Sequence, residues 1–194
     1  IMSKAMLSNG SKSGSALVMN PQTGEILAIV TLPTLNLNEI DRDNTEDLFS
    51  LSRSFLISDT YEPGSTFKTV VMAMALDLGL VNENTGFYCP GYMIIDGVRA
   101  NCHKKTGHGS QSLMSGFCNS CNCVFMQVAS MIGVDNFYNY LTKFGLDVAP
   151  KIDFPSVANS LVISKSELTK NDFYRNGFGH SIAISGLQLM MAIS

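Results

Sequence analysis

Ser65 and Lys68 stand three positions apart in the segment Pro63-Gly64-Ser65-Thr66-Phe67-Lys68, and this spacing could create a nucleophile. A serine hydroxyl is a poor nucleophile until a nearby base takes its proton. Residues three apart lie on one face of a helix, so the amine of Lys68 would be within reach of the hydroxyl. Lysine acts as a base near pH 7 only when it is desolvated or held near other cations. Ser65 is therefore a candidate nucleophile and Lys68 its candidate general base.

The chain on both sides of Ser65 bears on this interpretation. Pro63 and Gly64 interrupt the preceding chain, and the apolar run at residues 69–78 ends at Gly79. This pattern predicts a buried helix with Ser65 at its N-terminus. Such a helix would keep the lysine dry and offer free backbone N–H groups to an oxyanion. Ser-x-x-Lys also occurs often by chance on solvated helix surfaces, so the residues alone leave both interpretations open.

A second polar group, Ser120-Cys121-Asn122, lies farther along the chain. A hydroxyl and a carboxamide two positions apart can point into one cleft, where Ser120 would relay a proton and Asn122 would bind a substrate carbonyl. The alternative is a helix N-cap, because Ser and Asn cluster where the helix at residues 122–132 is expected to begin. Both interpretations can hold together.

The cysteines do not have the spacing of a zinc site. Only one Cys-x-x-Cys pair occurs, and His103 and His108 stand too loosely in the sequence to complete a ligand set. We therefore expect no metal and no cofactor, and interpret the thiols as buried and inert. Oxidation of Cys121 or Cys123, which flank Asn122, is a second hypothesis. The five cysteines are Cys89, Cys102, Cys118, Cys121 and Cys123.

The composition fits one globular domain and excludes several classes of function. The chain has 194 residues, of which 45% are hydrophobic, and a net charge of −3. Charges of both signs are scattered, and no run of Lys and Arg would follow a phosphate backbone, so nucleic acid is not an expected partner. No apolar stretch is long enough to cross a bilayer. We assign residues 1–14 to the end of a preceding segment or a linker helix, and residues 15–194 to the domain.

The elements that must position these residues are both strands and helices, so we expect a mixed α/β (α+β) fold. Residues 15–19 and 26–31 predict a β-hairpin around a Pro- and Gly-containing turn. Residues 32–59 are expected to form a connecting surface segment, and residues 80–109 irregular structure with only short β-like pieces such as residues 92–95. Helical patterns follow at residues 111–116, 122–132, 136–144 and 185–194.

Two motifs carry a resemblance to a known family. Residues 61–68 (Tyr-Glu-Pro-Gly-Ser-Thr-Phe-Lys) resemble the first active-site motif of class B penicillin-binding proteins, and residues 119–122 (Asn-Ser-Cys-Asn) resemble the second. Residues 13–28, 107–111 and 177–188 are also similar to family patterns, in the same order. The resemblance implies an antiparallel sheet flanked by helices, with a helical subdomain and a cleft between them, as in the penicillin-binding protein and serine β-lactamase-like transpeptidase fold.

The resemblance also implies an activity. In the family, a serine attacks the D-Ala-D-Ala end of a peptidoglycan stem peptide, releases D-Ala and transfers the acyl group to an amine, and β-lactams acylate the same serine. By position, Ser65 would be the nucleophile, Lys68 the base, Ser120 a proton relay and Asn122 a ligand of the substrate amide. The implied location is the extracytoplasmic face of a bacterial membrane, with an N-terminal anchor and a glycan-polymerising membrane partner.

The third family motif, Lys-Thr-Gly or Lys-Ser-Gly on a strand, is expected beyond residue 194, so we treat the chain as incomplete at the C-terminus and expect it to be impaired or inactive by itself. The literal Lys105-Thr106-Gly107 precedes Ser120 in a turn-rich segment, and we interpret it as a coincidence. One alternative is a class D β-lactamase or penicillin sensor, which shares Ser-Thr-Phe-Lys but typically has an apolar residue at the position of Asn122. Another is a non-catalytic structural module of the wall-synthesis complex.

Overall fold

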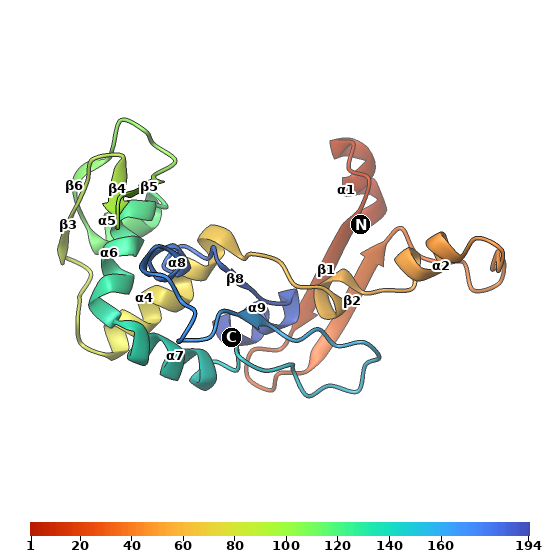
Figure 1. Cartoon of the computed structure of the whole chain (residues 1–194). Helices are drawn as coiled ribbons and strands as arrows, with labels where there is room; N and C mark the ends of the chain where they lie inside the picture. Colours follow the sequence, from red (N-terminus) through yellow and green to blue (C-terminus); the bar gives the residue numbers. More distant parts are fainter.

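An apolar helix, α4 (Lys68–Asp77), lies at the centre of the helical half of the molecule (Figure 1). The computed structural model describes residues 1–194. Val70, Val71 and Met74 of α4 are buried and pack with side chains of α6 (Asn122–Ile132). The apolar sequence of α4 predicted a buried helix. Leu76 lies exposed on this helix, so α4 is buried on one side only.

The chain contains both helices and short strands, as the mixed fold class predicts. The other helices are α1 (Met2–Asn9), α2 (Thr45–Leu51), α3 (Phe55–Ser58), the 3₁₀ turn η1 (Gly64–Phe67), α5 (Leu113–Cys118), α7 (Val134–Lys143), α8 (Lys170–Asn176) and α9 (Gly186–Ile193). The strands are β1 (Gly14–Met19), β2 (Ile26–Leu32), β3 (Gly86–Cys89), β4 (Tyr92–Ile95), β5 (Val98–Asn101), β6 (Gly109–Ser112), β7 (Leu161–Val162) and β8 (Ile182–Ala183).

The strands pair two by two, and every pair is antiparallel: β1 with β2, β3 with β6, β4 with β5, and β7 with β8. The β1–β2 hairpin was predicted, and it projects from the helical half together with α1 and α2 (Figure 1). Helix α3 contacts both α9 and β1, so α9 lies near the β1–β2 hairpin. The helical half, built on α4, α6, α7 and α8, carries the candidate site.

The segment at residues 80–109 is more regular than its turn-rich sequence predicted. Phe87 and Cys89 of β3 are buried while their neighbours are exposed, which is the alternation of a strand with one covered face. Asp96 and Gly97 have φ values of 48° and 80°, so they form the tight turn that joins β4 to β5. The β-like piece at residues 92–95 is confirmed as β4. The expectation of irregular structure is wrong for β3, β5 and β6, where the dense turn residues mark hairpins.

Three further helices, α2, α3 and α8, lie where the sequence predicted a connecting segment or no element. In the connecting segment, Asn44 caps α2 by accepting a hydrogen bond from the backbone N–H of Asp47 at 3.1 Å. Helix α8 begins after the N-cap Thr169. Its sequence is mostly polar and contains one buried aromatic residue, Phe173, which packs against Phe137 of α7.

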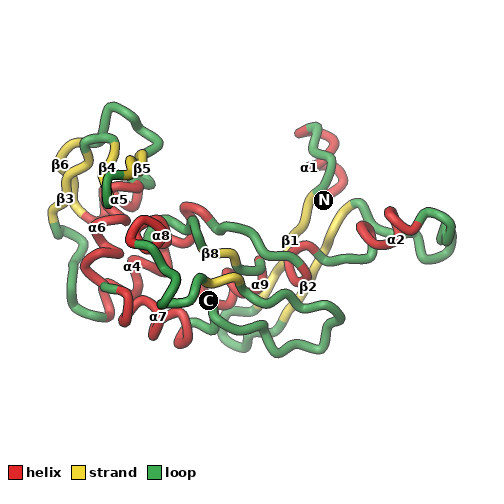
Figure 2. The backbone as a smooth tube through the Cα atoms, viewed as in Figure 1, coloured by secondary structure: helices red, strands yellow, loops and turns green.

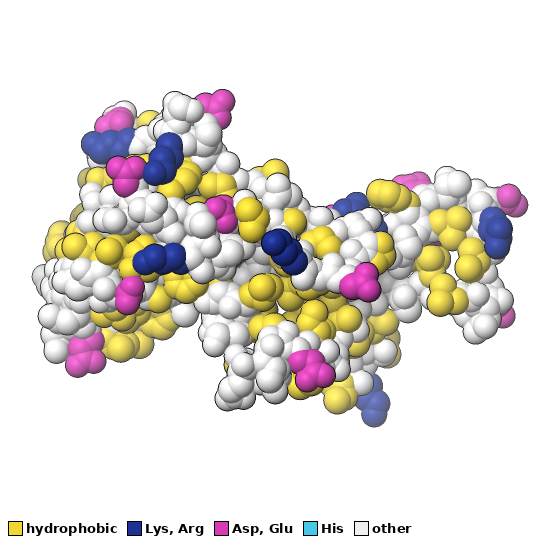
Figure 3. All heavy atoms as spheres, turned by 90° about the horizontal axis from the view of Figure 1, so that it is seen from below, with side chains coloured by type: hydrophobic (Ala, Val, Ile, Leu, Met, Phe, Trp, Pro, Cys, Tyr) yellow, Lys and Arg dark blue, Asp and Glu magenta, His cyan; other side chains and the backbone are white.

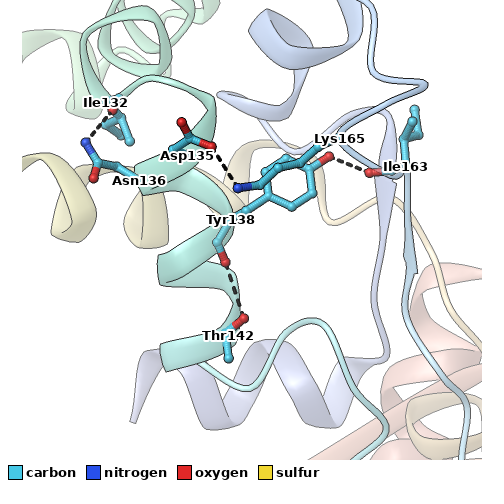
Figure 4. Close-up of polar contacts among 7 residues, drawn as sticks. All are labelled: Ile132, Asp135, Asn136, Tyr138, Thr142, Ile163 and Lys165. Atoms are coloured by element: carbon cyan, nitrogen blue, oxygen red, sulfur yellow. Dashed lines mark hydrogen bonds and ion pairs between the residues drawn. The ribbon is translucent and has the colours of Figure 1, made fainter.

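The chain between α7 and α8 is mostly loop (Figure 2) and is fastened back to α7 by side chains. The hydroxyl of Tyr138 donates to the carbonyl of Ile163, and Lys165 pairs with Asp135 at 2.8 Å (Figure 4). These contacts hold the long return segment against the helical half.

Apolar side chains also reach the surface, and Figure 3 shows them gathered in patches between scattered charges on one face. The exposed apolar residues of the chain include Leu76 of α4 and Met191 and Ile193 of α9. No helix in the structure has the length and the apolar character needed to span a membrane.

Candidate active site

Ser65 lies in the short 3₁₀ turn η1, directly before α4 begins at Lys68. The turn buries Phe67 beneath it and leaves Ser65 exposed. The Thr66 hydroxyl donates to the carbonyl of Pro63 at 2.7 Å, which ties the turn to the chain before it. The predicted position at a helix N-terminus therefore holds, with one turn of 3₁₀ helix in place of an α-helical start.

The amine of Lys68 is the centre of the site. Its Nζ lies 3.1 Å from Ser65 Oγ, 3.0 Å from Ser120 Oγ and 2.8 Å from Asn122 Oδ1. It also donates to the backbone carbonyl of Ser120 at 2.6 Å. The structure thus brings together all four residues singled out in the sequence, although more than fifty positions separate Lys68 from Asn122.

Lys68 is almost completely buried, with 1% of its surface exposed. Burial disfavours the charged ammonium and lowers the pKa of Lys68 to about 8, and the thiols of Cys102 and Cys121 act in the opposite direction. The Phe125 ring, 5.7 Å from Nζ, forms part of the apolar wall. A neutral amine that can accept the proton of Ser65 is therefore accessible close to neutral pH.

Ser120 and Asn122 owe their positions to the tight connection between α5 and α6. Ser120 has a φ of 49°, a left-handed conformation unusual for a residue with a side chain. The N-cap of α6 is Cys121, whose side chain makes no capping bond, so the helix-cap interpretation of Ser120 is wrong. Asn122 is the first residue of α6, and its Nδ2 donates to the carbonyl of Asn101 at 3.3 Å.

The segment after α8 supports the nucleophile turn from the other side. Gly64 N–H donates to the carbonyl of Gly179 at 3.0 Å. Glu62 accepts from the backbone N–H of Ser181 at 2.7 Å and pairs with His180 at 2.9 Å. Sequence reasoning assigned these residues no role, although the Gly-x-Gly at 177–179 was a signal of close backbone packing.

A hollow of about 350 Å³ opens beside Asn122, between β5 and α8. It has room for part of a peptide and offers both amide and basic groups. Its lining includes Arg99, Asn101, Asn122, Asn171, Arg175 and His180. A larger hollow of about 800 Å³, between the β1–β2 hairpin and α2–α3, is lined by none of the four site residues, whereas the smaller hollow is lined by Asn122.

The literal Lys105-Thr106-Gly107 lies in the turn between β5 and β6 and not on a strand. Lys105 and Thr106 are exposed. Gly107 packs on the backbone of Cys89, where an added Cβ would come within 2.4 Å of the carbonyl oxygen. The segment forms part of a loop, as expected if its match to the third family motif is a coincidence.

The expectation that the histidines stand too far from the cysteines is wrong in the folded chain. His108 lies with Cys89, Cys102 and Cys121, and their ligand atoms are all within 4.8 Å of one another. Cys118, the first residue of the Cys-x-x-Cys pair, is exposed and lies outside this cluster. Pairing of distant strands brings these residues together, and sequence spacing does not reveal it.

Comparisons with known proteins identify the family of the chain. The family profile described as penicillin binding protein transpeptidase domain matches residues 14–194. The chain is 29% identical to stage V sporulation protein D of Bacillus subtilis over 180 residues, which are 92% of this chain and 27% of that protein. It is 30% identical over its whole length to the probable peptidoglycan D,D-transpeptidase PbpC of Pseudomonas aeruginosa, and covers 33% of that protein.

The fold has close counterparts among solved structures. The TP domain of Burkholderia pseudomallei penicillin-binding protein 3 superposes with a TM-score of 0.82 and 26% identity, over 98% of this chain and 51% of that one. The chain therefore spans about half of this solved structure, and a third or less of the two curated relatives.

Proposed function

This chain belongs to the penicillin-binding protein transpeptidase family and fits its class B, and on that premise we propose that it is a peptidoglycan D,D-transpeptidase working through an acyl-enzyme on Ser65. The observation that carries the proposal is the convergence of Ser65, Ser120 and Asn122 on the buried amine of Lys68. A hydroxyl beside a buried amine is the arrangement that an acyl-transfer nucleophile requires.

In the first half-reaction, neutral Lys68 takes the proton of Ser65 Oγ across 3.1 Å while the oxygen attacks the carbonyl carbon of the penultimate D-Ala. The C–N bond to the terminal D-Ala then breaks, and an ester to Ser65 forms. The departing amine needs a proton, and Ser120 Oγ, 3.0 Å from Nζ, can relay it from Lys68. Asn122 would hold the substrate amide, because its carboxamide lies at the edge of the hollow.

In the second half-reaction, an amine of a neighbouring strand attacks the ester, and Ser65 recovers its proton. A β-lactam presents a strained amide in place of the D-Ala-D-Ala bond, so it acylates the same oxygen but its leaving group stays attached. We propose both stem peptides and β-lactams as ligands of this site.

Asn122 favours the transpeptidase over a class D β-lactamase or penicillin sensor. Its Oδ1 accepts from Lys68 at 2.8 Å, a contact that an apolar residue at this position could not make. A non-catalytic module is the other alternative. That alternative assigns no role to the 3.1 Å contact between the buried Lys68 amine and the exposed Ser65 hydroxyl.

We further propose that residues 15–194 belong to the transpeptidase domain, with residues 1–14, including α1, preceding it. The working location would be the extracytoplasmic face of a bacterial membrane, with an N-terminal anchor and a glycan-polymerising partner. No cofactor takes part in the proposed chemistry.

Labelling with a fluorescent penicillin tests the proposal. The full-length protein that contains these residues should form a covalent adduct that survives denaturation, and Ser65→Ala should abolish it. Ser110→Ala is the matched control, because Ser110 is an exposed serine on β6. Absence of an adduct on the unaltered full-length protein, or full labelling of its Ser65→Ala variant, would refute the assignment. Rapid hydrolysis of the adduct would instead indicate the β-lactamase.

A further inference from the structure

Three cysteines and one histidine from separate parts of the chain meet beside the candidate active site. Cys89 ends β3, Cys102 follows β5, His108 precedes β6 and Cys121 precedes α6. Their Sγ and imidazole nitrogen atoms all lie within 4.8 Å of one another. The proposed acyl transfer uses none of these four side chains.

Strand pairing explains how they meet. In the β3–β6 ladder Cys89 pairs with Gly109, so Cys89 lies beside His108. In the β4–β5 hairpin Tyr92 pairs with Asn101, and the next backbone N–H, that of Cys102, donates to the carbonyl of Gly91 at 2.8 Å. The two hairpin ends therefore present their side chains to the same small volume.

The backbone in this region is packed too closely for ordinary residues. Gly91 has a φ of +96°, and a Cβ there would lie 2.2 Å from the carbonyl oxygen of Lys105. Gly107 has a φ of +81°, and a Cβ there would lie 2.4 Å from the carbonyl oxygen of Cys89. The glycines let the Cys89 and His108 loops cross in contact, which fixes the spacing of the side chains they carry.

The distances match those of a tetrahedral metal site. With Zn–S bonds of about 2.3 Å and a Zn–N bond of about 2.0 Å, a regular tetrahedron separates two sulfurs by about 3.8 Å and a sulfur from a nitrogen by about 3.5 Å. The Sγ atoms of Cys102 and Cys121 are 3.9 Å apart. His108 Nδ1 lies 3.6 Å from Cys89 Sγ and 3.7 Å from Cys102 Sγ.

The burial of the cysteines and their sulfur and nitrogen donor atoms indicate which metal ion the cluster would bind. Cys89, Cys102 and Cys121 are at most 2% exposed, and their polar side-chain partners are sulfur atoms and imidazoles. Thiolates with imidazole select zinc over calcium or magnesium, which prefer oxygen. The separation of 3.9 Å between the sulfurs of Cys102 and Cys121 also differs from that of a disulfide, whose bond is about 2.05 Å.

We propose that Cys89, Cys102, His108 and Cys121 bind one zinc ion in a closed structural site. Four protein ligands complete the tetrahedron, so the ion has no open position for substrate and takes no part in the chemistry. It joins the β3–β6 and β4–β5 hairpins to the start of α6.

The proposed ion would act as a positioning element for the active site. Cys121 stands between Ser120 and Asn122, and Cys102 follows Asn101, whose carbonyl accepts from Asn122 Nδ2 at 3.3 Å. Cys121 is thus adjacent in sequence to two residues that contact the Lys68 amine, and Cys102 is adjacent to a residue that binds one of these two. Binding the metal would hold Ser120 in its left-handed conformation, with a φ of 49°.

Metal analysis of the protein tests the site without reference to activity. Protein purified without chelators should contain about one zinc per chain by mass spectrometry of the metal. After zinc is removed under reducing conditions, Co²⁺ should produce the visible bands of a tetrahedral site and thiolate-to-cobalt charge transfer. This measurement on the unaltered chain needs no variant that folds.

Matched variants assign the ligands. Cys102→Ser and His108→Ala should reduce bound zinc severalfold, whereas Cys118→Ser and His103→Ala should retain it. Cys118 is an exposed thiol outside the cluster, and the His103 ring packs on that of His108 with centroids 5.1 Å apart. Thermal melting by circular dichroism shows whether each variant is folded.

Several outcomes would overturn the proposal. One is a zinc content below about a tenth of an equivalent, both in the protein as purified and after reconstitution. Another is an intact mass that shows a Cys102–Cys121 disulfide. A third is an equal zinc content in Cys102→Ser and in the unaltered protein. Loss of zinc should slow penicillin acylation by about tenfold to a hundredfold. Zinc bound but without effect on acylation would overturn the positioning role alone, and failure of Ser65 to label would leave the metal content as measured.

Discussion

Gly179 packs directly against Gly64, the residue before the candidate nucleophile. Gly64 N–H donates to Gly179 O at 3.0 Å, and a Cβ at position 179 would lie 2.2 Å from Gly64 O and 2.8 Å from the Cβ of Phe67. Gly179 also has a φ of +75°. The turn that presents Ser65 is therefore held by a backbone contact that only glycine permits.

Gly179→Ala should disturb both the fold and the site. The left-handed conformation costs about 1–2 kcal/mol for a residue with a side chain, and the backbone overlap adds about 1–3 kcal/mol. Urea unfolding should therefore show a loss of about 2–5 kcal/mol. Acylation by a fluorescent penicillin should slow by at least about tenfold, because Gly64 must move and carry Ser65 with it.

Gly24→Ala is the matched control for that substitution. Gly24 has a φ of +72° but has no atom within 4 Å of an added Cβ, and it lies in the turn between β1 and β2. It should lose only the conformational cost of about 1–2 kcal/mol and acylate at the normal rate. Equal losses in the two variants would show that the Gly64 contact contributes nothing.

Local patterns predicted the parts of this molecule that local physics determines. The hairpin at β1–β2, the helix after Ser65 and the bounds of α6 follow from turn residues and apolar spacing. Helix α8 was missed because its sequence, apart from Phe173 and Tyr174, is polar and resembles a loop. The sequence motifs indicated Ser65, Lys68, Ser120 and Asn122, but their contacts depend on packing between α4 and α6.

The cysteine cluster shows the limit of sequence spacing most clearly. Cys89 meets His108 because β3 pairs with β6 across the whole of the β4–β5 hairpin. A register that places Cys89 opposite Gly109 is a long-range property of the fold, and the sequence contains no local signal for it.

The rate of acylation should rise with pH through about 8. Burial lowers the pKa of Lys68 to about 8 from 10.5, so the neutral amine that accepts the proton of Ser65 dominates above about pH 8, not only above 10.5. Below that pH the rate should fall by about tenfold per pH unit. Stopped-flow labelling from pH 6 to 9 measures the profile, and Lys68→Arg should be slow and lack the rise. A flat profile in the unaltered protein would contradict the role of Lys68.

Two contacts on α7 should differ sharply in their contribution to stability (Figure 4). Tyr138→Phe removes the hydrogen bond to the partly buried carbonyl of Ile163 and should cost about 1 kcal/mol in urea unfolding. Asp135→Asn removes an ion pair with Lys165 in which the Asp135 side chain is 89% exposed, and should cause no measurable change at physiological salt. A larger loss for Asp135→Asn than for Tyr138→Phe would reverse this ranking.

Asn122→Asp should move the pH midpoint of acylation upward. The Oδ1 of Asn122 lies 2.8 Å from Lys68 Nζ, and a carboxylate there would stabilise the ammonium and raise the pKa of Lys68 by about one unit or more. At pH 7 the variant should therefore acylate at least about tenfold more slowly, yet recover as the pH increases. Asn119→Asp is the control, since Asn119 donates to Gln111 Oε1 at 3.1 Å and not to Lys68. The same midpoint in Asn122→Asp and Asn119→Asp would mean that Asn122 does not set the basicity of Lys68, whereas a shift in the first alone would identify the lysine as the titrating base.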